Sequence, residues 1–576
     1  MKKSPGLILL VAILAAAMLA PPVASADEKA AQREYAQRRA RLLEQLAAPV
    51  VLFGYAAEDF GLADPERKSP QTTFRQEENF YYLTGVRQEG AALLLVPLTP
   101  AAKAAGLAGE TLYLPPRDRR REHWDGVRLG PDDPEAAEQT GVAQVKTTAA
   151  LRGDLEKAAT LFPEFYALFP PPGAEPARTH AGRWLAWLKE LLPHTGVQNV
   201  RGTIGAMRQV KSESEQALLR TSIERTLEAH REALRAMRPG MYEYEIASLM
   251  TYTFERAGCE RPAYPPIVGS GPNSTVLHHA DPRRQMQAGE VVVIDVGAEC
   301  AGYPADITRT LPTSGKFTAR QREIYEIVLG AQNAAIAAVK PGMTMARTGE
   351  NSLYRIAYDY INTHGKDLKG EPLGKYFTHG LGHHVGLQVH DAGDPNRPLE
   401  PGMIVTIEPG IYIPEENLGV RIEDMVLVTE KGAVLLSGSL PRTVDDVERV
   451  MAVEGTASIS GLCVVSMPPL GYPPLARLAR IQGKVQVDVE IDPSGRVRRA
   501  TARGGHPLLQ KYAREGLERW VFGCLGIPER FPVLHTVDLA FKIEGEPAGT
   551  RVWKVNFDLP AGAEIVTNPP LPTRSD

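Results

Sequence analysis

Residues 290–310 read EVVVIDVGAECAGYPADITRT and place two carboxylates beside one apolar strand. The run 291–294 is typical of a strand buried on both faces, and Asp295 ends it. A turn at 302–304 would return the chain and bring Asp306 close to Asp295. Two adjacent buried anions need a cation, because a lone carboxylate is costly to desolvate. From this segment alone, a salt bridge or a solvated strand end is the alternative.

The length and the charge of the chain limit the classes of protein to which it can belong. The 576 residues correspond to roughly three domains of ordinary size. The chain carries 65 basic and 69 acidic residues, a formal net charge of −4. This balance does not indicate nucleic acid or an acidic lipid surface as a partner. We therefore expect partners to be recognised at local sites.

The first 26 residues have the pattern of a secretory signal peptide. Lys2 and Lys3 precede an apolar stretch at 7–20, and the tripeptide ASA at 24–26 supplies a small-residue cleavage site. A membrane anchor is the alternative, but the stretch is shorter than the roughly 20 residues of a spanning helix. The sequence predicts cleavage after Ala26 and export to the periplasm or the exterior.

Four cysteines are too few for a disulfide scaffold in so long a chain, although export would permit a bridge. Cys259 and Cys300 lie in the middle of the chain, whereas Cys463 and Cys524 lie near its end. We expect a bridge between Cys463 and Cys524.

Residues 27–175 are expected to form an α/β domain. A helix is predicted at 27–47, and strands are predicted at 50–53, 91–96 and 111–114. The domain contains FRQEENFYYLTG at 74–85 and YLPPRDRRREHWDGVRLG at 113–130. Taken alone, both motifs are typical of surface and packing loops. The proline-rich segment 170–173 is expected to be a linker.

The middle of the chain repeats one order of elements. Each copy has a helix, a Pro-Gly-Met break, a second helix, a histidine-bearing loop and a strand ending in a carboxylate. Ser212 and Glu215 have capping-box spacing at the start of the first helix. The matched positions are Pro239 with Pro341, His278 with His390, Asp295 with Glu408, and Asp306 with Glu423. Four pairs in the same order predict an internal two-fold pseudo-symmetry around one shared cleft.

Four carboxylates and a histidine-rich loop converge on this cleft. Glu408 ends the strand at 404–407, and Arg421 and Glu423 share a face by strand alternation. The loop 377–390 adds His379, His383, His384 and His390. Two divalent ions would neutralise the four carboxylates, and the oxygen-rich set suits Mn(2+), with Co(2+) or Zn(2+) also fitting. Such a pair activates water and polarises a carbonyl, which predicts hydrolysis.

These motifs resemble those of a known family. GEVVVIDVG with YPADITRT, HGLGHHVGLQVHD, PGMIVTIEPGIYI and VRIED are similar to motifs of the pita-bread metallopeptidases, specifically aminopeptidase P and the related prolidases. The two N-terminal motifs extend the resemblance over about residues 72–449 and favour aminopeptidase P. The resemblance implies an α/β N-terminal domain followed by an α+β pita-bread catalytic domain at 195–450.

The resemblance also implies roles for the matching residues. The implied metal ligands are Asp295, Asp306, His383, Glu408 and Glu423. Asp295 would bind one ion with both oxygens, Asp306 and Glu423 would bridge the pair, and Glu408 would also carry a proton to and from the water. The residues implied to orient substrate or stabilise the tetrahedral intermediate are His278, His379 and His390, with Arg421 beside the site.

Two histidines depart from the family pattern. His279 stands where relatives usually have tyrosine, which leaves the match of His278 open by one position. His384 is an uncommon neighbour of the predicted ligand His383. We expect both extra imidazoles to line the site rather than to bind metal.

The implied activity is removal of the N-terminal residue from peptides with proline in second position. The amide nitrogen of proline carries no proton, and the proline ring fixes the backbone. A pocket dedicated to binding proline is therefore reasonable. Proline-containing peptides are therefore the expected partners, and a homo-oligomer stays open. Prolidase activity on dipeptides is the near alternative. A metal-free binding module is a more distant one, and the five predicted ligands argue against it.

Residues 462–560 are expected to form a separate small α+β domain after a linker at 455–471. Strands are predicted at 484–491, from 497 and at 533–543, with a helix at 508–519. YPPLARLARIQGKVQVDVEIDPSGRV and ERWVF resemble the C-terminal domain of TonB-family proteins. Between 472 and 524 there are ten Lys and Arg against five Asp and Glu. We expect an accessory module for a peptide or envelope-protein partner, with edge-strand pairing as one mode.

Overall fold

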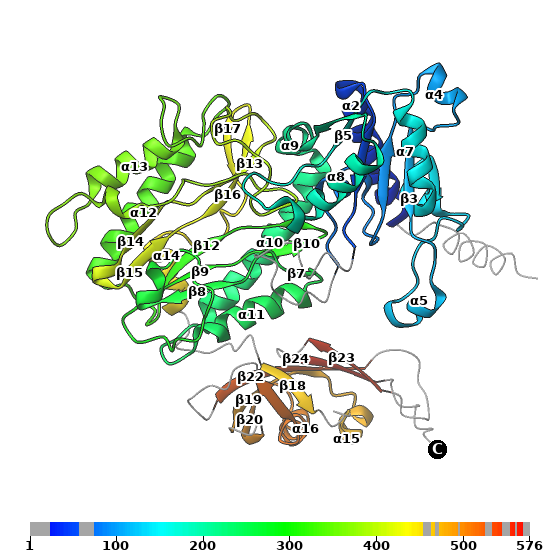
Figure 1. The fold of residues 1–576 in the computed structure, drawn as a ribbon. Coiled ribbons are helices and arrows are strands. Elements are labelled where there is room, and N and C mark those ends of the chain that lie inside the picture. Colours follow the sequence, from blue (N-terminus) through cyan, green and yellow to red (C-terminus); the bar gives the residue numbers. More distant parts are fainter. Residues whose placement is uncertain are drawn as a thin grey trace, which may run out of the picture.

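The computed structural model describes residues 24–56, 74–452, 462–466, 472–492, 496–524, 533–543, 553–558 and 562–567. Three units follow one another: an α/β domain in blue and cyan, a larger α+β domain in green and yellow, and a small α+β module in orange and red (Figure 1). The first 23 residues of the predicted signal peptide lie outside these ranges. Among the described helices, none has both the length and the apolar character needed to cross a bilayer.

The N-terminal domain is built on a six-stranded sheet in the order β4-β3-β2-β1-β5-β6. Its strands are β1 (Val50–Phe53), β2 (Ala92–Leu95), β3 (Glu110–Leu114), β4 (Gln144–Thr147), β5 (Glu164–Ala167) and β6 (Gly196–Asn199). The first three pair antiparallel, whereas the outer strands pair parallel. The three strands predicted here are confirmed. The sheet includes β6, which lies beyond the predicted domain end at 175.

The first N-terminal motif is a buried helix, not a surface loop. The helices of this domain are α2 (Ala24–Leu46), α3 (Glu78–Thr84), α4 (Pro100–Ala104), α5 (Arg119–Asp125), α6 (Ala136–Thr140), α7 (Leu151–Ala159) and α8 (His180–Leu191). Glu77 caps α3 by accepting a hydrogen bond from the Phe80 N–H at 2.7 Å, and Gly85 ends it with a positive φ of 67°. These caps let the motif enter the core, where Phe80 and Leu83 are fully buried.

The first half of the catalytic domain places two helices against two small sheets. Its helices are α9 (Arg201–Gln209), α10 (Glu213–Ala236) and α11 (Glu243–Arg256), and its strands are β7 (Arg261–Pro262), β8 (Ile267–Ser270), β9 (Val291–Asp295), β10 (Ala298–Cys300), β11 (Tyr303–Pro304) and β12 (Thr308–Pro312). The predicted capping box of Ser212 and Glu215 starts α10. The sheets have the orders β12-β9-β8 and β11-β10-β7. Helix α10 packs on β10 and β11, and α11 packs on β7 and β8.

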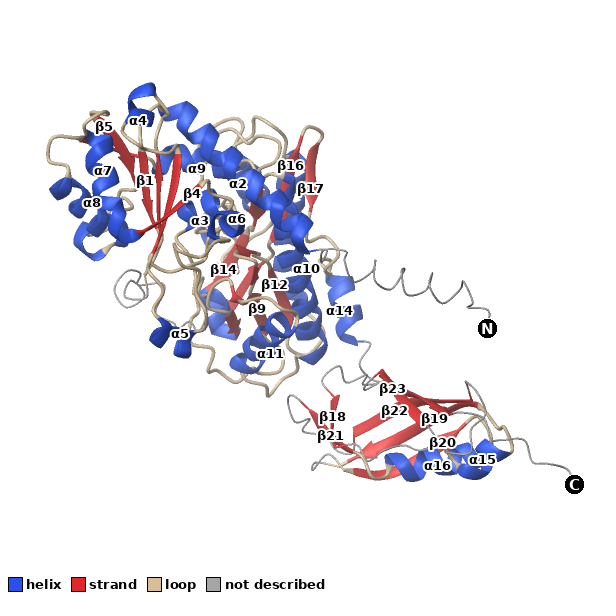
Figure 2. Ribbon diagram, turned by 90° about the vertical axis from the view of Figure 1, so that its right-hand side faces the viewer, coloured by secondary structure: helices blue, strands red, loops and turns tan. Residues whose placement is uncertain are grey.

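The second half again has two helices before its strands. It comprises α12 (Ala319–Ala338), α13 (Leu353–His364), β13 (Ile404–Ile407), β14 (Gly410–Ile413), β15 (Leu418–Arg421), β16 (Asp424–Thr429), β17 (Gly432–Leu435) and α14 (Val444–Ala452). The order β13-β16-β17 forms one sheet, and β14 pairs with β15. In Figure 2 the strands β9, β12 and β14 lie inside the domain, with α10, α11 and α14 beside them.

The turn inside the opening sequence falls slightly earlier than predicted. Ala301 and Gly302 form a two-residue loop, and Cys300 pairs with Tyr303 across it. Both loop residues have positive φ, 53° and 82°, as a type I′ hairpin requires. The prediction had placed the turn at 302–304. The return of the chain is as expected, because β9 and β12 pair antiparallel with Asp295 opposite Thr308.

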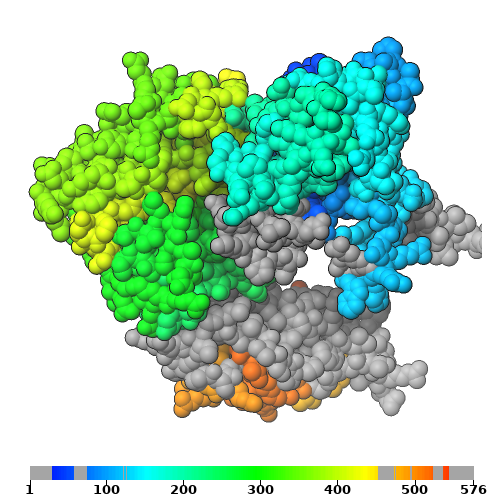
Figure 3. All heavy atoms as spheres, in the orientation of Figure 1, coloured from blue at the N-terminus to red at the C-terminus, as the bar shows by residue number. Residues whose placement is uncertain are grey.

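One hydrophobic cluster spans the N-terminal and catalytic domains, and the N-terminal sheet has a second cluster of its own. A single cluster of buried side chains includes Phe80 and Leu83 from α3 together with Ile204 from α9 and the interior strands of the catalytic domain. The hydroxyl of Tyr82 donates to the Met207 carbonyl at 3.0 Å across the same contact. Figure 3 shows the cyan surface of the N-terminal domain lying against the green and yellow surface of the catalytic domain. The cluster and this hydrogen bond therefore hold the two domains in a fixed relative position.

The C-terminal module has a core of its own. Its elements are β18 (Leu462–Ser466), α15 (Pro474–Leu478), β19 (Gly483–Ile491), β20 (Val497–Arg503), α16 (Pro507–Leu517), β21 (Val521–Cys524), β22 (Val533–Ile543), β23 (Trp553–Asp558) and β24 (Gly562–Thr567). A five-stranded sheet, β20-β19-β22-β24-β23, buries one face under α16, and Trp520 is 1% exposed. The predicted strands and helix are confirmed. Strand β18 lies inside the predicted linker at 455–471, and the remainder of that linker up to residue 471 is outside the described residues.

The structure contains a disulfide that the sequence analysis did not predict. Cys259, just after α11, is bonded to Cys300 in β10. For the predicted pair, the strand register sets Cys463 opposite Gly523 and Cys524 opposite Leu462, so the two residues are one step out of direct opposition. The side chains of that pair lie outside the described part of the chain. The observed bridge joins a helix end to a strand, an approach that sequence spacing does not reveal.

Candidate active site

Strand ends deliver the four predicted carboxylates to one place. Asp295 is the last residue of β9, and Asp306 lies two residues before β12, its antiparallel partner. Glu408 follows β13, and Glu423 precedes β16, which pairs with β13 in the same way. The two sheets meet directly, because the Glu423 N–H donates to the Thr308 carbonyl at 3.1 Å.

The donor atoms gather in three overlapping groups. These are Asp295, Asp306 and Glu423; His383, Glu408 and Glu423; and Asp306, His383 and His390. Within each group the ligand atoms lie within 4.8 Å of one another. The Nε2 atom of His383 is 3.3 Å from Asp306 Oδ2 and 3.5 Å from Glu408 Oε1. The structure thus brings all five predicted ligands together, and His390 lies beside them.

Tyr264 joins two of the carboxylates, and sequence reasoning did not identify it. Its hydroxyl oxygen lies 2.6 Å from Asp295 Oδ1 and 2.5 Å from Asp306 Oδ1. Because a hydroxyl carries one proton, it donates to one of the two at a time. Burial and the charge of Asp295 raise the pKa of Tyr264 well above its ordinary value, so it remains a donor. A single tyrosine in a proline-rich loop has no periodic or spacing signal that would have predicted this role.

Arg421 and Tyr412 connect the carboxylates to His379. Its guanidinium donates to Asp295 Oδ2 at 2.7 Å and to the Tyr412 hydroxyl at 2.9 Å. The same hydroxyl lies 2.9 Å from His379 Nε2. Burial and the Arg421 charge lower the pKa of His379 to about 4. His379 is therefore neutral near pH 7 and held in one orientation, and Tyr412 is a second residue that the sequence did not predict.

The remaining histidines separate into two groups. His390 packs against His383 with ring centroids 4.1 Å apart, and burial followed by the charges of His383 and His278 lowers the pKa of His390 to about 4. His278 is exposed on its loop and close enough to act electrostatically on His379 as well. His279 instead contacts the buried Glu243 at 3.1 Å, away from the carboxylates. His384 is buried near Lys211 and Asp391, where burial lowers its pKa to about 4.

The four carboxylates perturb one another strongly. Burial and the neighbouring acids raise the pKa of Glu423 well above its ordinary value, and burial raises that of Glu408 to about 7. Burial and the charge of Asp295 also raise the pKa of Asp306. Burial opposes ionisation of Asp295 too, but Arg421 and Tyr264 outweigh it and leave that pKa below its usual range. One arginine and one histidine cannot keep four buried acids ionised together, so the cluster calls for further positive charge.

The donor set fits a pair of divalent cations. Its four carboxylates supply four negative charges, and its imidazole supplies one neutral nitrogen. Although burial favours the neutral ring of His383, Asp306 and Glu408 raise its pKa to about 9, which shows how strongly the acids attract a cation to this point. Oxygen-rich sets of this kind suit Mn(2+), and a carboxylate-imidazole mixture also accepts Zn(2+) or Co(2+).

Comparison with family models matches all three units. Metallopeptidase family M24 matches residues 217–430, and the aminopeptidase P N-terminal domain matches residues 35–162. The Gram-negative bacterial TonB protein C-terminal domain matches residues 468–542. The first match contains every residue of the carboxylate cluster, the second covers the N-terminal domain, and the third covers the separate module.

Relatives that match over nearly their own whole length agree with these family matches. The chain is 34% identical over 450 residues to a Xaa-Pro aminopeptidase of Haemophilus influenzae, covering 73% of this chain and 98% of the relative. A Xaa-Pro aminopeptidase of Escherichia coli is 34% identical over 451 residues with the same coverage. Among solved structures, zinc-substituted Escherichia coli aminopeptidase P with product has a TM-score of 0.63 at 31% identity, covering 73% of this chain and 98% of that chain. Pseudomonas aeruginosa aminopeptidase PepP has a TM-score of 0.64 at 29% identity, with coverages of 74% and 99%.

The fold and the donor set define a metallopeptidase with a site for divalent ions. The α/β domain in front of it narrows the class, because this domain matches the one that precedes the catalytic domain in aminopeptidase P. The chain belongs to metallopeptidase family M24, in its aminopeptidase P group, and carries an additional TonB-like C-terminal domain. It is a metallo-aminopeptidase.

Proposed function

We propose that this protein is an exported aminopeptidase that removes the N-terminal residue from peptides with proline in second position. The observation that carries the proposal is a carboxylate and histidine cluster in an M24 domain that an aminopeptidase P N-terminal domain precedes. The relatives that match nearly over their whole length are named Xaa-Pro aminopeptidase.

Asp295, Asp306, His383, Glu408 and Glu423 would hold two divalent ions. When bound, the ions supply Lewis acidity that activates water and polarises the scissile carbonyl. Glu408 accepts the proton that the attacking water loses and delivers it to the proline nitrogen as the C–N bond breaks. The water oxygen ends on the released carboxylate, and the proline nitrogen leaves as a secondary amine. The Thr406 hydroxyl lies 3.3 Å from Glu408 Oε1 and orients that carboxylate.

His379, His390 and His278 would bind the substrate. His379 and His390 are uncharged near neutral pH, because burial lowers their pKa values to about 4, so they add no charge to the site. The ring of His379 is fixed by the Gly380 carbonyl, 2.8 Å from its Nδ1 atom, and by the Tyr412 hydroxyl, 2.9 Å from its Nε2 atom. In this proposal His379 shapes the site, and the N–H group of neutral His390 stabilises the oxyanion that forms when water attacks.

The metal used in the cell is part of the proposal. We favour Mn(2+), because four of the five donors are carboxylates. Zn(2+) and Co(2+) remain alternatives, and the zinc-substituted Escherichia coli enzyme is a relative whose site was loaded with zinc. An exported chain also meets zinc, which binds most donor sets more tightly than manganese does.

Prolidase is the second candidate function. A Xaa-Pro dipeptidase of Pyrococcus furiosus is 38% identical over 244 residues, covering 42% of this chain and 66% of that relative. This match is confined to part of the chain, whereas the aminopeptidases match through the N-terminal domain as well. A metal-free binding module has less support, since none of the five donors is replaced.

Substrate length separates the candidates. The metal-depleted enzyme should be assayed with a Xaa-Pro dipeptide and a Xaa-Pro-Yaa tripeptide, with manganese or zinc added back. We expect faster turnover of the tripeptide. Turnover of the dipeptide alone would select prolidase. Asp306→Ala and Glu408→Ala should abolish either activity, and unchanged hydrolysis in both variants would rule out the metal mechanism. A folded wild-type protein that hydrolyses neither peptide would select the binding module.

Export is proposed from two observations. The N-terminal pattern resembles a secretory signal peptide, and the Cys259–Cys300 bridge suits an oxidising compartment. We therefore place the mature protein in the periplasm or outside the cell. Fractionation of cells that express the full chain tests this: activity confined to the cytoplasm would contradict it.

The C-terminal module is proposed to bind a peptide or an envelope protein. In the five-stranded sheet, β20 and β23 are the edge strands and are free of a neighbour on one side within that sheet. Edge strands can accept an extended peptide as an added strand. Capture of such a partner by the isolated module would support the proposal, and a monomeric module that binds none would argue against it. A homo-oligomer of the whole protein is a separate proposal, and its mass in solution tests it.

A further inference from the structure

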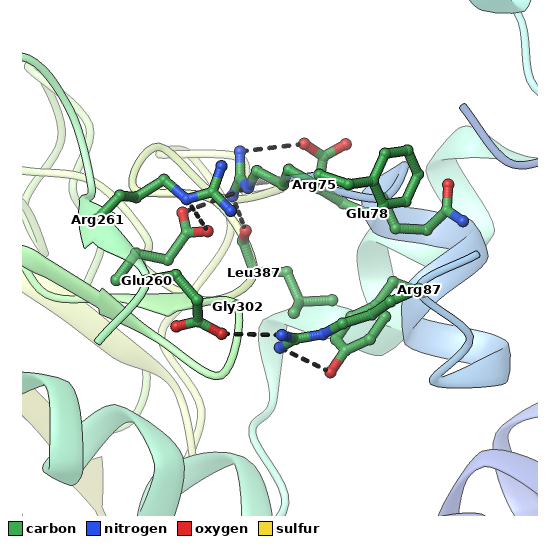
Figure 4. Close-up of a pocket in the computed structure, with 11 residues that line it drawn as sticks. Arg75, Glu78, Arg87, Glu260, Arg261, Gly302 and Leu387 are labelled. Carbon is green, nitrogen blue, oxygen red and sulfur yellow. Dashed lines mark hydrogen bonds and ion pairs between the residues drawn. The ribbon is translucent and has the colours of Figure 1, made fainter. Parts of the chain in front are cut away.

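One arginine of the N-terminal domain reaches across to two segments of the catalytic domain. Arg75, just before α3, donates from its guanidinium to the Leu387 carbonyl at 2.6 Å. The same group lies 3.3 Å from Glu299 Oε2 and 3.5 Å from Glu78 Oε1. Figure 4 shows these contacts on one side of a pocket between the two domains. The Arg75 side chain is 19% exposed, so these contacts are largely shielded from water.

The two catalytic segments that Arg75 joins are those that carry metal ligands. Leu387 lies between His383 and His390 on the histidine-rich loop. Glu299 lies in β10, on the hairpin between Asp295 and Asp306. One guanidinium therefore spans two chain segments whose relative position sets the distance from His383 to Asp306. The planar fork of arginine suits this, because its donors point to several acceptors at fixed angles.

The other end of the histidine-rich loop is held from the same direction. Asp391, which follows His390, forms ion pairs with Arg208 and with Lys211, the latter at 3.4 Å. Arg208 also donates to Asn79 of α3 at 2.8 Å. Both ends of the segment 387–391 are thus linked to the N-terminal domain: Leu387 through Arg75, which lies three residues before α3, and Asp391 through Arg208, which contacts α3.

We propose that Arg75 is a positioning residue for the metal centre, through which the N-terminal domain fixes His383 relative to Asp306. The inference rests on the proposed metal-dependent function. It gives the domain a role in building the centre in addition to any contact with substrate. Loss of Arg75 leaves the Leu387 carbonyl without this donor and frees the loop from the hairpin, so the ligands must be ordered when metal binds. Outer groups of this kind are typically worth about 10–100-fold in metal affinity.

The pocket supplies a matched control. Arg87 lines the same pocket and also crosses between the domains, to Glu260 at 2.8 Å, but it does not contact the histidine-rich loop (Figure 4). Arg75→Gln and Arg87→Gln each remove one interdomain ion pair. A general weakening of the domain contact would affect both variants. Positioning of the metal centre would be affected by Arg75→Gln alone.

The first measurement uses the metal-free full-length protein. Hydrogen–deuterium exchange of amides in 384–391 should be about tenfold faster in Arg75→Gln than in the wild type, and unchanged in Arg87→Gln. Manganese titration should then show weaker binding by about 10–100-fold in Arg75→Gln only. If Arg75→Gln does not fold, Arg75→Lys keeps the charge and the aliphatic stem and carries the same test with the same expected direction.

Two results would overturn the inference. One is wild-type loop exchange and wild-type metal affinity in the folded Arg75 variant. The other is an equal change in Arg87→Gln. Failure of the proposed function is distinguishable, because it would appear as a wild-type protein that binds no metal, whereas the exchange difference is measured without metal.

Discussion

At the scale of single residues, the centre depends on neutral and cationic groups that keep acids together. Tyr264 and Arg421 share Asp295, and their contacts at 2.6 and 2.7 Å are among the reasons that this carboxylate stays ionised while its neighbours resist ionisation. Loss of a group that hydrogen-bonds a metal ligand typically weakens metal binding by about 10–100-fold. The Tyr264 hydroxyl is therefore a suitable group for testing the metal site by mutation.

Tyr264→Phe removes one hydroxyl and keeps the ring. We expect metal affinity to fall by about tenfold, because Asp295 and Asp306 lose a shared donor. Calorimetric titration of the metal-depleted protein with manganese measures this affinity. Tyr412→Phe is the control, since its hydroxyl contacts Arg421 and His379 but no predicted ligand, and it should lower kcat with little change in metal affinity. Wild-type metal affinity in Tyr264→Phe would contradict this role.

At the scale of elements, α10 holds the two loops that carry the first pair of acids. His230 of this helix is buried, and its Nε2 atom lies 3.3 Å from the Val296 carbonyl and 3.0 Å from the Ile307 carbonyl. Each carbonyl belongs to the residue next to a predicted ligand. The imidazole thus links the two strand ends through their backbone carbonyls.

This arrangement predicts a pH dependence. Burial, followed by the charge of Arg309, lowers the pKa of His230 to about 4 in the folded protein, against about 6.5 when unfolded. The unfolded state therefore binds the proton first, and stability is lost as pH falls from about 6.5 towards 4, by up to about 1.4 kcal/mol per pH unit. Urea denaturation of the metal-free protein at pH 7, 6 and 5 measures the free energy of unfolding. This free energy should fall less steeply with decreasing pH in His230→Gln than in the wild type. Equal slopes would contradict this assignment.

The disulfide is a second feature of this scale. It ties the end of α11 to β10, across 41 residues of chain. Reduction, or the Cys259→Ser/Cys300→Ser variant, should lower the free energy of unfolding by about 2–4 kcal/mol. Thermal denaturation with and without a reductant measures it, and the double variant should be insensitive to the reductant. A wild-type melting temperature that ignores the reductant would show that the bridge does not stabilise the fold.

At the scale of the whole molecule, catalysis and the TonB-like module are built on separate cores. The catalytic core continues into the N-terminal domain, while the module buries its own set of side chains around Trp520. Two cores of this kind are expected to fold independently. We therefore propose that the chemistry belongs to the first two domains and that the module binds a partner.

Ending the chain after Ala452 tests this division and keeps α14 whole. We expect unchanged kcat and KM on small peptides, because every predicted site residue lies before the cut. The matched measurement is circular dichroism of the truncated protein, to show that it is folded. A folded truncation without activity would contradict the division.

The sequence predicted what local patterns control. Strands ending in acids, the capping box at Ser212 and the helix at 508–519 follow from periodicity and end signals, and the structure has them. Tyr264, Arg75 and the Cys259–Cys300 bridge could not be predicted, because each depends on which distant segments meet. The burial of the motif around Phe80 could not be predicted either, because it depends on the contact of α3 with α2 and α9, which spacing along the chain does not record.

The central claim is that four buried carboxylates and His383 form a centre for two divalent ions. The most direct test is to strip the purified protein with a chelator, titrate manganese, and count bound ions while following cleavage of a Xaa-Pro-Yaa peptide. We expect two ions per chain and activity that returns with them, and neither in Asp306→Ala. A folded wild-type protein that takes up no manganese, cobalt or zinc, or that cleaves equally well after stripping, would contradict the claim.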